Sequence, residues 1–86
     1  MKFELYQEVA LAEDIPDHGL RKGDVATIVE QIEPRPGNEP GYALEVFNAV
    51  GETVDVLMVS ESQIEELRPN ELLHIRPFAD RELKLA

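Results

Sequence analysis

The sequence contains no cysteine and no tryptophan. Without cysteine the chain can form neither disulfides nor thiolate metal sites, as is typical of a cytoplasmic protein. Long apolar runs are also missing, because no stretch approaches the roughly 20 residues of a membrane span. Near the N-terminus, Glu4 interrupts the apolar core that a signal peptide requires. We therefore expect a cytoplasmic protein that does not associate with a membrane.

Basic residues are scarce, with 8 Lys and Arg against 18 Asp and Glu, which gives a net charge of −10. The imbalance is confined to residues 1–67, which hold 15 acids and 4 bases, whereas residues 68–86 hold 3 acids and 4 bases. Binding nucleic acid through its phosphates needs clustered Lys and Arg. We therefore expect no nucleic-acid partner. The acidic body instead favours a basic protein partner, or simply high solubility.

Signatures of catalysis are also missing from the sequence. There is no glycine-rich phosphate loop, and no serine lies in a Gly-x-Ser-x-Gly elbow. His18 and His74 lack metal-ligand spacing. Asp14, Asp17 and His18 are one conceivable cation cluster, although such residues in turns more often bond the backbone. We expect a non-enzymatic protein with no cofactor and no metal.

Peptide recognition is the remaining class of activity. The chain has five aromatic residues, and none lies in residues 12–23, where a groove for proline-rich peptides would need them. Addition of a partner strand to an exposed sheet edge fits the composition better, because a small open barrel leaves edges unpaired.

Five short stretches rich in β-branched and alternating apolar residues predict strands. They cover residues 6–11, 24–32, 42–47, 53–59 and 63–67. Residues 60–62 predict a 3₁₀ turn, with Ser60 as its cap and Gln63 at the capping-box spacing. A short helix over residues 60–67 is the competing interpretation, because that stretch holds good helix formers.

Turn-forming residues separate the predicted strands. They gather in residues 12–23, 33–41 and 48–52. In the first of these segments, Ile15 and Leu20 are apolar anchors on two arms that diverge from a turn around residues 17–19. In the last, Asn48 and Gly51 are able to take positive φ in a tight hairpin turn.

This order of strands and connections resembles the small SH3-like barrel. The expected fold class is all-β, an open barrel of about five antiparallel strands with a C-terminal extension. Residues 1–68 would form the barrel and residues 69–86 the tail. Leu72, Leu73 and Ile75 in the tail predict either an extra edge strand or a docking segment, and residues 80–85 predict one helical turn.

At the sequence level the chain resembles DUF4926, a family of small uncharacterised bacterial proteins. The residues that carry the resemblance are Leu5, Tyr6, Val9, Leu11, Asp14, Ile15, Pro16, Gly19, Leu20, Gly23, Ala26–Val29, Tyr42, Leu44–Phe47, Gly51–Thr53 and Leu67. It covers roughly residues 5–67 and consists of turn and core positions. Because the family's function is not established, the resemblance implies no catalytic residues.

Charge and size favour a protein-interaction module that binds a basic protein partner through an acidic surface. An antitoxin- or immunity-like protein, which presents carboxylates where nucleic-acid phosphates would bind a basic nuclease, is one concrete form. The candidate contact residues are Asp14, Asp17, His18, Arg21, Lys22, Glu30, Glu33 and Glu39. The alternative is a small accessory or regulatory subunit of a larger enzyme that docks through its apolar tail. A homodimer is also expected, since symmetric dimers are the commonest oligomers.

Overall fold

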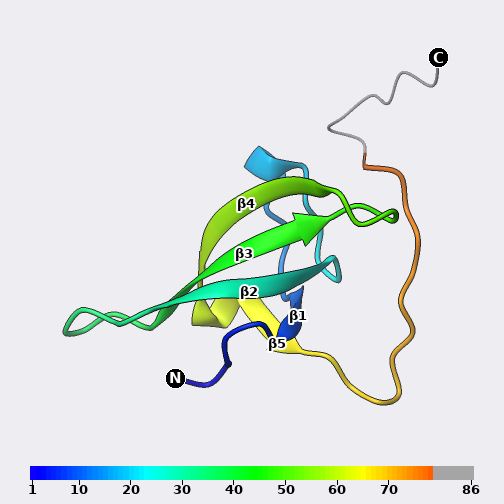
Figure 1. Ribbon diagram of the computed structural model, residues 1–86. Helices are drawn as coiled ribbons and strands as arrows, with labels where there is room; N and C mark the ends of the chain where they lie inside the picture. The colour runs from blue at the N-terminus through cyan, green and yellow to red at the C-terminus, as the bar shows by residue number, and fades with distance from the viewer. Residues whose placement is uncertain (79–86) are drawn as a thin grey trace.

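The computed structural model describes residues 1–78, and it confirms an all-β fold (Figure 1). The elements in chain order are β1 (Glu8–Leu11), the 3₁₀ turn η1 (Pro16–His18), β2 (Val25–Ile32), β3 (Gly41–Phe47), β4 (Thr53–Ser60), the 3₁₀ turn η2 (Glu61–Gln63) and β5 (Ile64–Glu66). The strands form one open sheet in the order β4-β3-β2-β1-β5, and each neighbouring pair is antiparallel. This order is consistent with the expected SH3-like barrel.

The core lies on one face of this curved sheet. Because successive side chains in a strand point to opposite faces, the cross-strand partners Ile28, Leu44 and Leu57 form an apolar row across three strands. Val9 and its partner Ala26 extend the same inner face into β1. All five side chains are buried, and no polar or charged residue is buried anywhere in residues 1–78. The inner face therefore supplies an apolar core, in which the buried ring of Tyr42 carries a hydrogen-bonded hydroxyl.

The opening loop has the predicted form of two arms joined by a turn. Ile15 and Leu20 form an isolated antiparallel bridge between the arms, and Leu20 is buried in the core. Pro16 begins η1, where its fixed φ suits the first turn and its missing N–H costs nothing. Gly19 ends the turn with φ of 69°, a left-handed conformation that glycine adopts without strain.

The first strand is shorter than predicted, because residues 5 and 6 form a turn. Tyr6 has φ of 68°, and its N–H donates to the Ile28 carbonyl oxygen. Its side chain is consequently exposed, whereas Phe3 is buried in the core. Local alternation predicts a strand here, but the turn interrupts it and brings Phe3 back over the sheet.

The competing helix over residues 60–67 does not form. The predicted 3₁₀ turn forms instead, with the Gln63 Oε1 accepting a hydrogen bond of 2.8 Å from the Ser60 N–H. β5 then begins at Ile64 and pairs with β1. In the β3–β4 turn, Gly51 takes positive φ as expected, whereas the Asn48 side chain accepts hydrogen bonds from the Val50 and Glu52 N–H groups.

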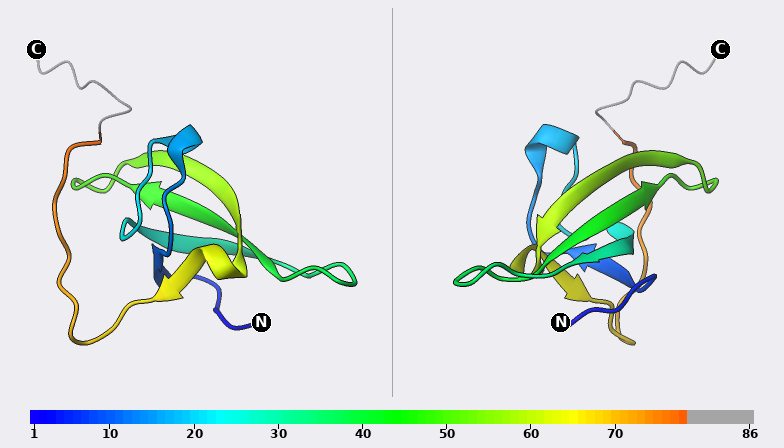
Figure 2. Two further views of the ribbon diagram at one scale, coloured as in Figure 1. Left: turned by 180° about the vertical axis from the view of Figure 1, so that it is seen from behind. Right: turned by 60° about the vertical axis from the view of Figure 1, so that its left-hand side comes forward.

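The tail forms neither strand nor helix between residues 69 and 78, so the extra edge strand predicted there is wrong. The tail leaves β5 as an extended segment without strand partners and runs beside the barrel (Figures 1 and 2). The helical turn predicted for residues 80–85 lies outside the described residues. No helix in residues 1–78 is long and apolar enough to cross a membrane.

A hydrogen-bonded cluster around Tyr42 ties the N-terminal segment to the sheet. The Tyr42 hydroxyl donates to a carboxylate oxygen of Glu61 at 2.5 Å and accepts a hydrogen bond of 3.1 Å from the Phe3 N–H. The rings of Tyr42 and Phe3 meet edge to face, with centroids 5.6 Å apart. The same Glu61 oxygen accepts a hydrogen bond from the Lys2 N–H. One phenol therefore connects three separate segments of the chain.

This cluster changes the acidity of both partners. Burial, and then the hydrogen bond to Glu61, raise the pKa of Tyr42 above its usual value. The hydrogen bond from Tyr42, followed by that from the Lys2 N–H, lowers the pKa of Glu61 below its usual 4.5. A carboxylate with a lowered pKa contributes stability above its unfolded pKa and loses that contribution as the pH falls through its folded pKa.

We predict that Tyr42→Phe lowers the free energy of unfolding by about 1–2 kcal/mol at neutral pH, because it removes the hydroxyl and keeps the ring. Urea unfolding measures this change. The difference from wild type should shrink as the pH falls below 4.5, where Glu61 becomes protonated. Tyr6→Phe is the matched control, since the Tyr6 side chain is 70% exposed. Equal stability of Tyr42→Phe and wild type at neutral pH would contradict the prediction.

Candidate functional site

The outer face of the sheet carries a set of carboxylates that the register brings together. Glu8 pairs with Thr27, Thr27 pairs with Glu45, and Glu45 pairs with Val56, so these four side chains form one row across β1, β2, β3 and β4. Neighbouring strands are about 4.8 Å apart, which places Glu8 and Glu45 on strands about 10 Å apart. The two carboxylates thus flank Thr27.

Two further rows complete this acidic face. Glu30 pairs with Ala43, which pairs with Met58, and on the other side Glu65 pairs with Ala10. We define the acidic face as Glu8, Glu30, Glu45 and Glu65 together with the outward-facing side chains between them. The five strands contain no Lys, Arg or His. The face therefore presents carboxylates with no base on the strands to neutralise them.

Apolar side chains accompany these carboxylates at the β4 edge of the sheet. Val56 is 57% exposed and Met58 is 65% exposed. One carboxylate oxygen of Glu45 already accepts a hydrogen bond within the protein, because the Thr53 hydroxyl donates to it at 2.5 Å. The acidic face thus combines negative charge with contact area for apolar groups, which is the composition of an interface core bordered by charge.

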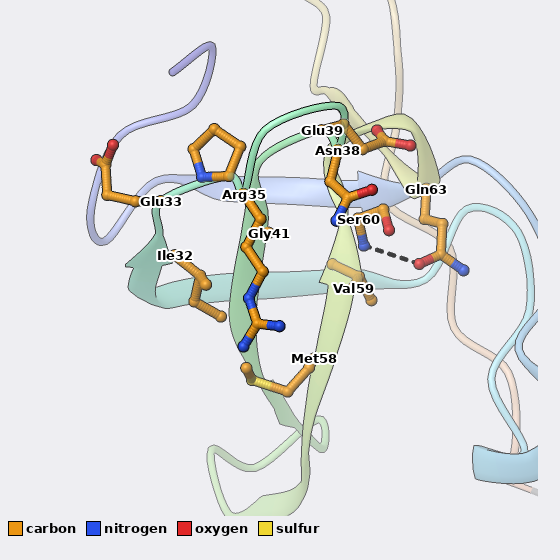
Figure 3. A pocket seen from close by; sticks show the side chains of 11 residues that line it. Ile32, Glu33, Arg35, Asn38, Glu39, Gly41, Met58, Val59, Ser60 and Gln63 are labelled. Carbon is orange, nitrogen blue, oxygen red and sulfur yellow. Dashed lines mark hydrogen bonds between the residues drawn. The ribbon is translucent and has the colours of Figure 1, made fainter.

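A shallow groove of about 330 Å³ continues the acidic face beneath the β2–β3 loop. Ile32, Gly41 and Ser60 form the next cross-strand row, and all three line the groove. Figure 3 shows the Arg35 side chain reaching from the loop toward Met58 along this groove. The Glu39 carboxylate stands at the rim, where it accepts hydrogen bonds from the N–H and hydroxyl of Ser62 at 2.7 and 3.0 Å.

The candidate residues of the opening loop mostly hold that loop together. An Asp14 carboxylate oxygen accepts a hydrogen bond of 2.8 Å from the Lys22 N–H. The His18 Nδ1 lies 2.7 Å from an Asp55 carboxylate oxygen, which fastens η1 to β4. Asp17 and the Arg21 side chain are exposed. Within residues 1–78, no three His, Asp or Glu side chains gather in a geometry suited to a metal ion.

The structure separates the predicted contact residues into three places. The opening loop, with residues 14–22, and the β2–β3 loop, with Glu33 and Glu39, extend from different ends of the sheet in each of the views in Figures 1 and 2. Glu30 alone belongs to the acidic face. Sequence reasoning missed Glu8, Glu45 and Glu65, because only the pairing register shows that they share one face with Glu30.

Sequence reasoning also missed how the tail is fastened to the body. The Arg76 guanidinium donates to both carboxylate oxygens of Asp24, at 2.9 and 2.5 Å, and to the Gly19 carbonyl oxygen at 3.2 Å. Asp24 also accepts a hydrogen bond of 2.7 Å from the Arg21 N–H. Phe78 packs against the core beyond this ion pair. The excess of bases over acids after residue 67 is the one sequence signal for this contact.

Asp24 is half-buried, and two opposing effects act on its acidity. Burial raises the pKa of Asp24, but the hydrogen bonds from Arg76 and the Arg21 N–H, together with the guanidinium charge, outweigh burial and leave the pKa below its usual 3.8. The hydrogen bond to Asp24 raises the pKa of Arg76 in turn. The pair therefore stabilises the fold above pH 3.8 and loses its contribution as the pH falls through the lowered pKa.

Residues 5–66 match the model of a family described as Domain of unknown function (DUF4926). No curated protein and no solved structure matches the chain.

We predict that Arg76→Gln lowers the free energy of unfolding by about 1 kcal/mol, because it removes a bidentate charge-assisted contact that is partly shielded from water. Urea unfolding at neutral pH measures the loss, which should diminish below pH 3.8 as Asp24 protonates. Arg68→Gln is the matched control, since Arg68 is an exposed arginine of the same tail. An equal effect of the two substitutions would show that the Asp24 contact adds nothing.

Proposed function

The chain belongs to the DUF4926 family, and from this premise we propose that it is a non-enzymatic protein-interaction module that binds a basic protein partner. The observation that carries the proposal is the acidic face, where Glu8, Glu30, Glu45 and Glu65 share one surface of a sheet whose strands contain no base. Complementary charge speeds encounter with a basic protein and fixes its orientation.

Carboxylates of the acidic face differ from the acids that hold the fold together. Asp24, Asp55 and Glu61 are each engaged by another side chain of the protein. The carboxylates of Glu8 and Glu30 make no hydrogen bond or ion pair within the described residues. Both side chains are exposed. Their charges are therefore available to a partner, and the exposed Val56 and Met58 add apolar contact area beside them.

An antitoxin- or immunity-like role is the concrete form of this function. A nuclease binds the phosphates of nucleic acid with clustered Lys and Arg, and a row of carboxylates on a rigid sheet is a protein surface that competes for the same side chains. The distance of about 10 Å between the strands of Glu8 and Glu45 lets two basic side chains be engaged at once. The cytoplasm is the compartment in which such a partner would be met.

The test is isothermal titration of the protein with the product of its neighbouring gene. We predict binding that weakens at least tenfold when NaCl is raised from about 50 to about 500 mM, because salt screens exposed charges. The triple variant Glu8→Gln, Glu30→Gln, Glu65→Gln should weaken binding roughly tenfold at low salt, which is about 1.4 kcal/mol. Glu45 is left intact because it accepts the Thr53 hydrogen bond.

A matched control removes the same charge elsewhere, with Asp17→Asn, Glu33→Gln and Glu66→Gln. All three are exposed and lie off the acidic face. The control should keep most of the affinity. A greater loss of affinity in the control than in the triple variant would indicate that the partner contacts the loops. Binding that is absent or insensitive to salt would overturn the electrostatic function.

The alternative function is an accessory or regulatory subunit of a larger enzyme that docks through the apolar tail. One observation favours it, namely that Leu72, Leu73 and Ile75 are 95%, 76% and 86% exposed. For this role we predict that truncation after Arg68 abolishes assembly in a co-purification with the neighbouring gene product, while the triple acidic-face variant still assembles. The reverse pattern would contradict it.

A further inference from the structure

The sheet has two edges, and β4 forms the longer one. The strand order β4-β3-β2-β1-β5 leaves one side of β4 and one side of β5 without a strand neighbour (Figure 1). β5 has three residues, two of which are acids, whereas β4 has eight and contains neither lysine nor proline. Edge strands that avoid pairing with other chains are usually short or carry lysine or proline. β4 is therefore the edge that is suited to accept a further strand.

The register shows which main-chain groups of β4 face this open side. The Glu61 N–H donates to the Pro40 carbonyl oxygen at 2.9 Å, in continuation of the β3–β4 register. Hydrogen-bonded pairs alternate with non-bonded ones along an antiparallel ladder, so β3 takes the main-chain groups of every second residue of β4, counted back from Glu61. The N–H and C=O groups of Val56 and Met58 lie between those residues and point away from β3.

These outward main-chain groups are available for pairing. Within residues 1–78, the N–H and C=O groups of Val56 and Met58 have no hydrogen-bond partner. Ser60 faces the open side too, but its N–H already donates to the Gln63 side chain at 2.8 Å. The free part of the edge therefore covers Val56 to Met58. A strand added here would continue the ladder through main-chain hydrogen bonds, while side chains select its sequence.

The surroundings of Met58 favour an apolar residue in the added strand. Val56 and Met58 point to the outer face of the sheet, and both side chains are exposed. Met58 lines the groove beneath the β2–β3 loop together with Ile32, and the Arg35 side chain reaches toward it (Figure 3). A residue opposite Met58 would meet the apolar atoms of this side chain, and the charge of Arg35 disfavours a second base there.

The surroundings of Val56 favour a basic residue. Beyond Val56, its cross-strand row continues with Glu45, Thr27 and Glu8. One oxygen of Glu45 accepts the Thr53 hydroxyl, and the other makes no hydrogen bond within residues 1–78. A residue opposite Val56 lies two strand spacings, about 10 Å, from β3, so the long side chain of Lys or Arg extends across Val56 toward this oxygen. A neutral residue gains nothing from these carboxylates, and an acid is repelled.

We propose that β4 accepts an extended segment of the basic partner as an added antiparallel strand, and that this segment has the pattern apolar-x-basic. The apolar residue lies opposite Met58 and the basic residue opposite Val56, because the added strand runs in the opposite direction to β4. The inference rests on the proposed function, since it names what the partner presents to the acidic face. It adds that the main chain of one sheet edge makes the contact, which attraction between charges alone does not require.

The experiment is amide hydrogen exchange, followed by NMR on the isotope-labelled full chain. The probe is the peptide acetyl-Thr-Leu-Thr-Arg-Thr-amide, added to about 5 mM because so short a strand is expected to bind in the millimolar range. We expect the Val56 and Met58 amides to exchange fast in the free protein and about threefold more slowly with the peptide. The Leu57 amide, which pairs with β3, should be protected in both states. The same peptide with Gln in place of Arg should bind about threefold more weakly at low salt.

Proline substitutions test the role of the main chain. Val56→Pro removes an edge-facing N–H, and proline is tolerated in an edge strand where that N–H faces outward. This variant should bind the peptide about tenfold more weakly than wild type, whereas Val56→Ala keeps the N–H and should lose less. Glu66→Pro is the matched control, because it places a proline on β5 at the opposite edge of the sheet, and it should bind like wild type. The exchange measurement on wild type decides the question even where Val56→Pro does not fold.

The outcomes separate this inference from the proposed function. A peptide that protects neither Val56 nor Met58, or equal binding of the Arg and Gln peptides, would overturn the inference. The proposed function would survive that result if the neighbouring gene product still binds in a salt-dependent way, because its test does not use the peptide. Failure of the neighbouring gene product to bind, with the β4 amides still protected by the peptide, would instead count against the proposed function alone.

Discussion

The structure depends on burying one face of one curved sheet. The core of residues 1–78 is apolar apart from the hydrogen-bonded hydroxyl of Tyr42, and the buried rows follow the antiparallel register strand by strand. Since an unpaired charge is costly to bury, the acids of the strands must lie on the opposite face or at the margins. The acidic face is thus a consequence of the same alternation that makes the core.

Two hydrogen-bonded carboxylates hold the segments that flank the sheet against it. Glu61 accepts hydrogen bonds from Tyr42 and Lys2 and holds the N-terminal segment, whereas Asp24 accepts hydrogen bonds from Arg76 and Arg21 and holds the tail and the opening loop. Both carboxylates have a lowered pKa for this reason. The acids of the described residues therefore divide into those that hold segments together and those, such as Glu8 and Glu30, that are exposed and make no hydrogen bond or ion pair with the described part of the protein.

Two surfaces of different chemistry result from this division. The acidic face combines charge with the exposed Val56 and Met58, and the field of its charges is strongest when salt is low. The tail segment between β5 and Arg76 is the second surface, where the apolar side chains of Leu72, Leu73 and Ile75 are exposed.

Local patterns in the sequence determined the elements of this fold. Period-two alternation located the strands, Pro16 and Gly19 located the turn of the opening loop, and Gln63 at the capping-box spacing identified η2. These features depend on residues close together in the chain, where sterics and local hydrogen bonds act directly.

The candidate surfaces, by contrast, depend on contacts between distant residues. Arg76 reaches Asp24 across 52 positions, and Glu45 shares a face with Glu8 only through the pairing of β1, β2 and β3. Sequence reasoning placed eight contact residues on one surface, and the fold distributes them over two loops and the sheet. Register and curvature decide which acids converge, because a shift of one residue in a strand's pairing would turn each of its side chains to the other face.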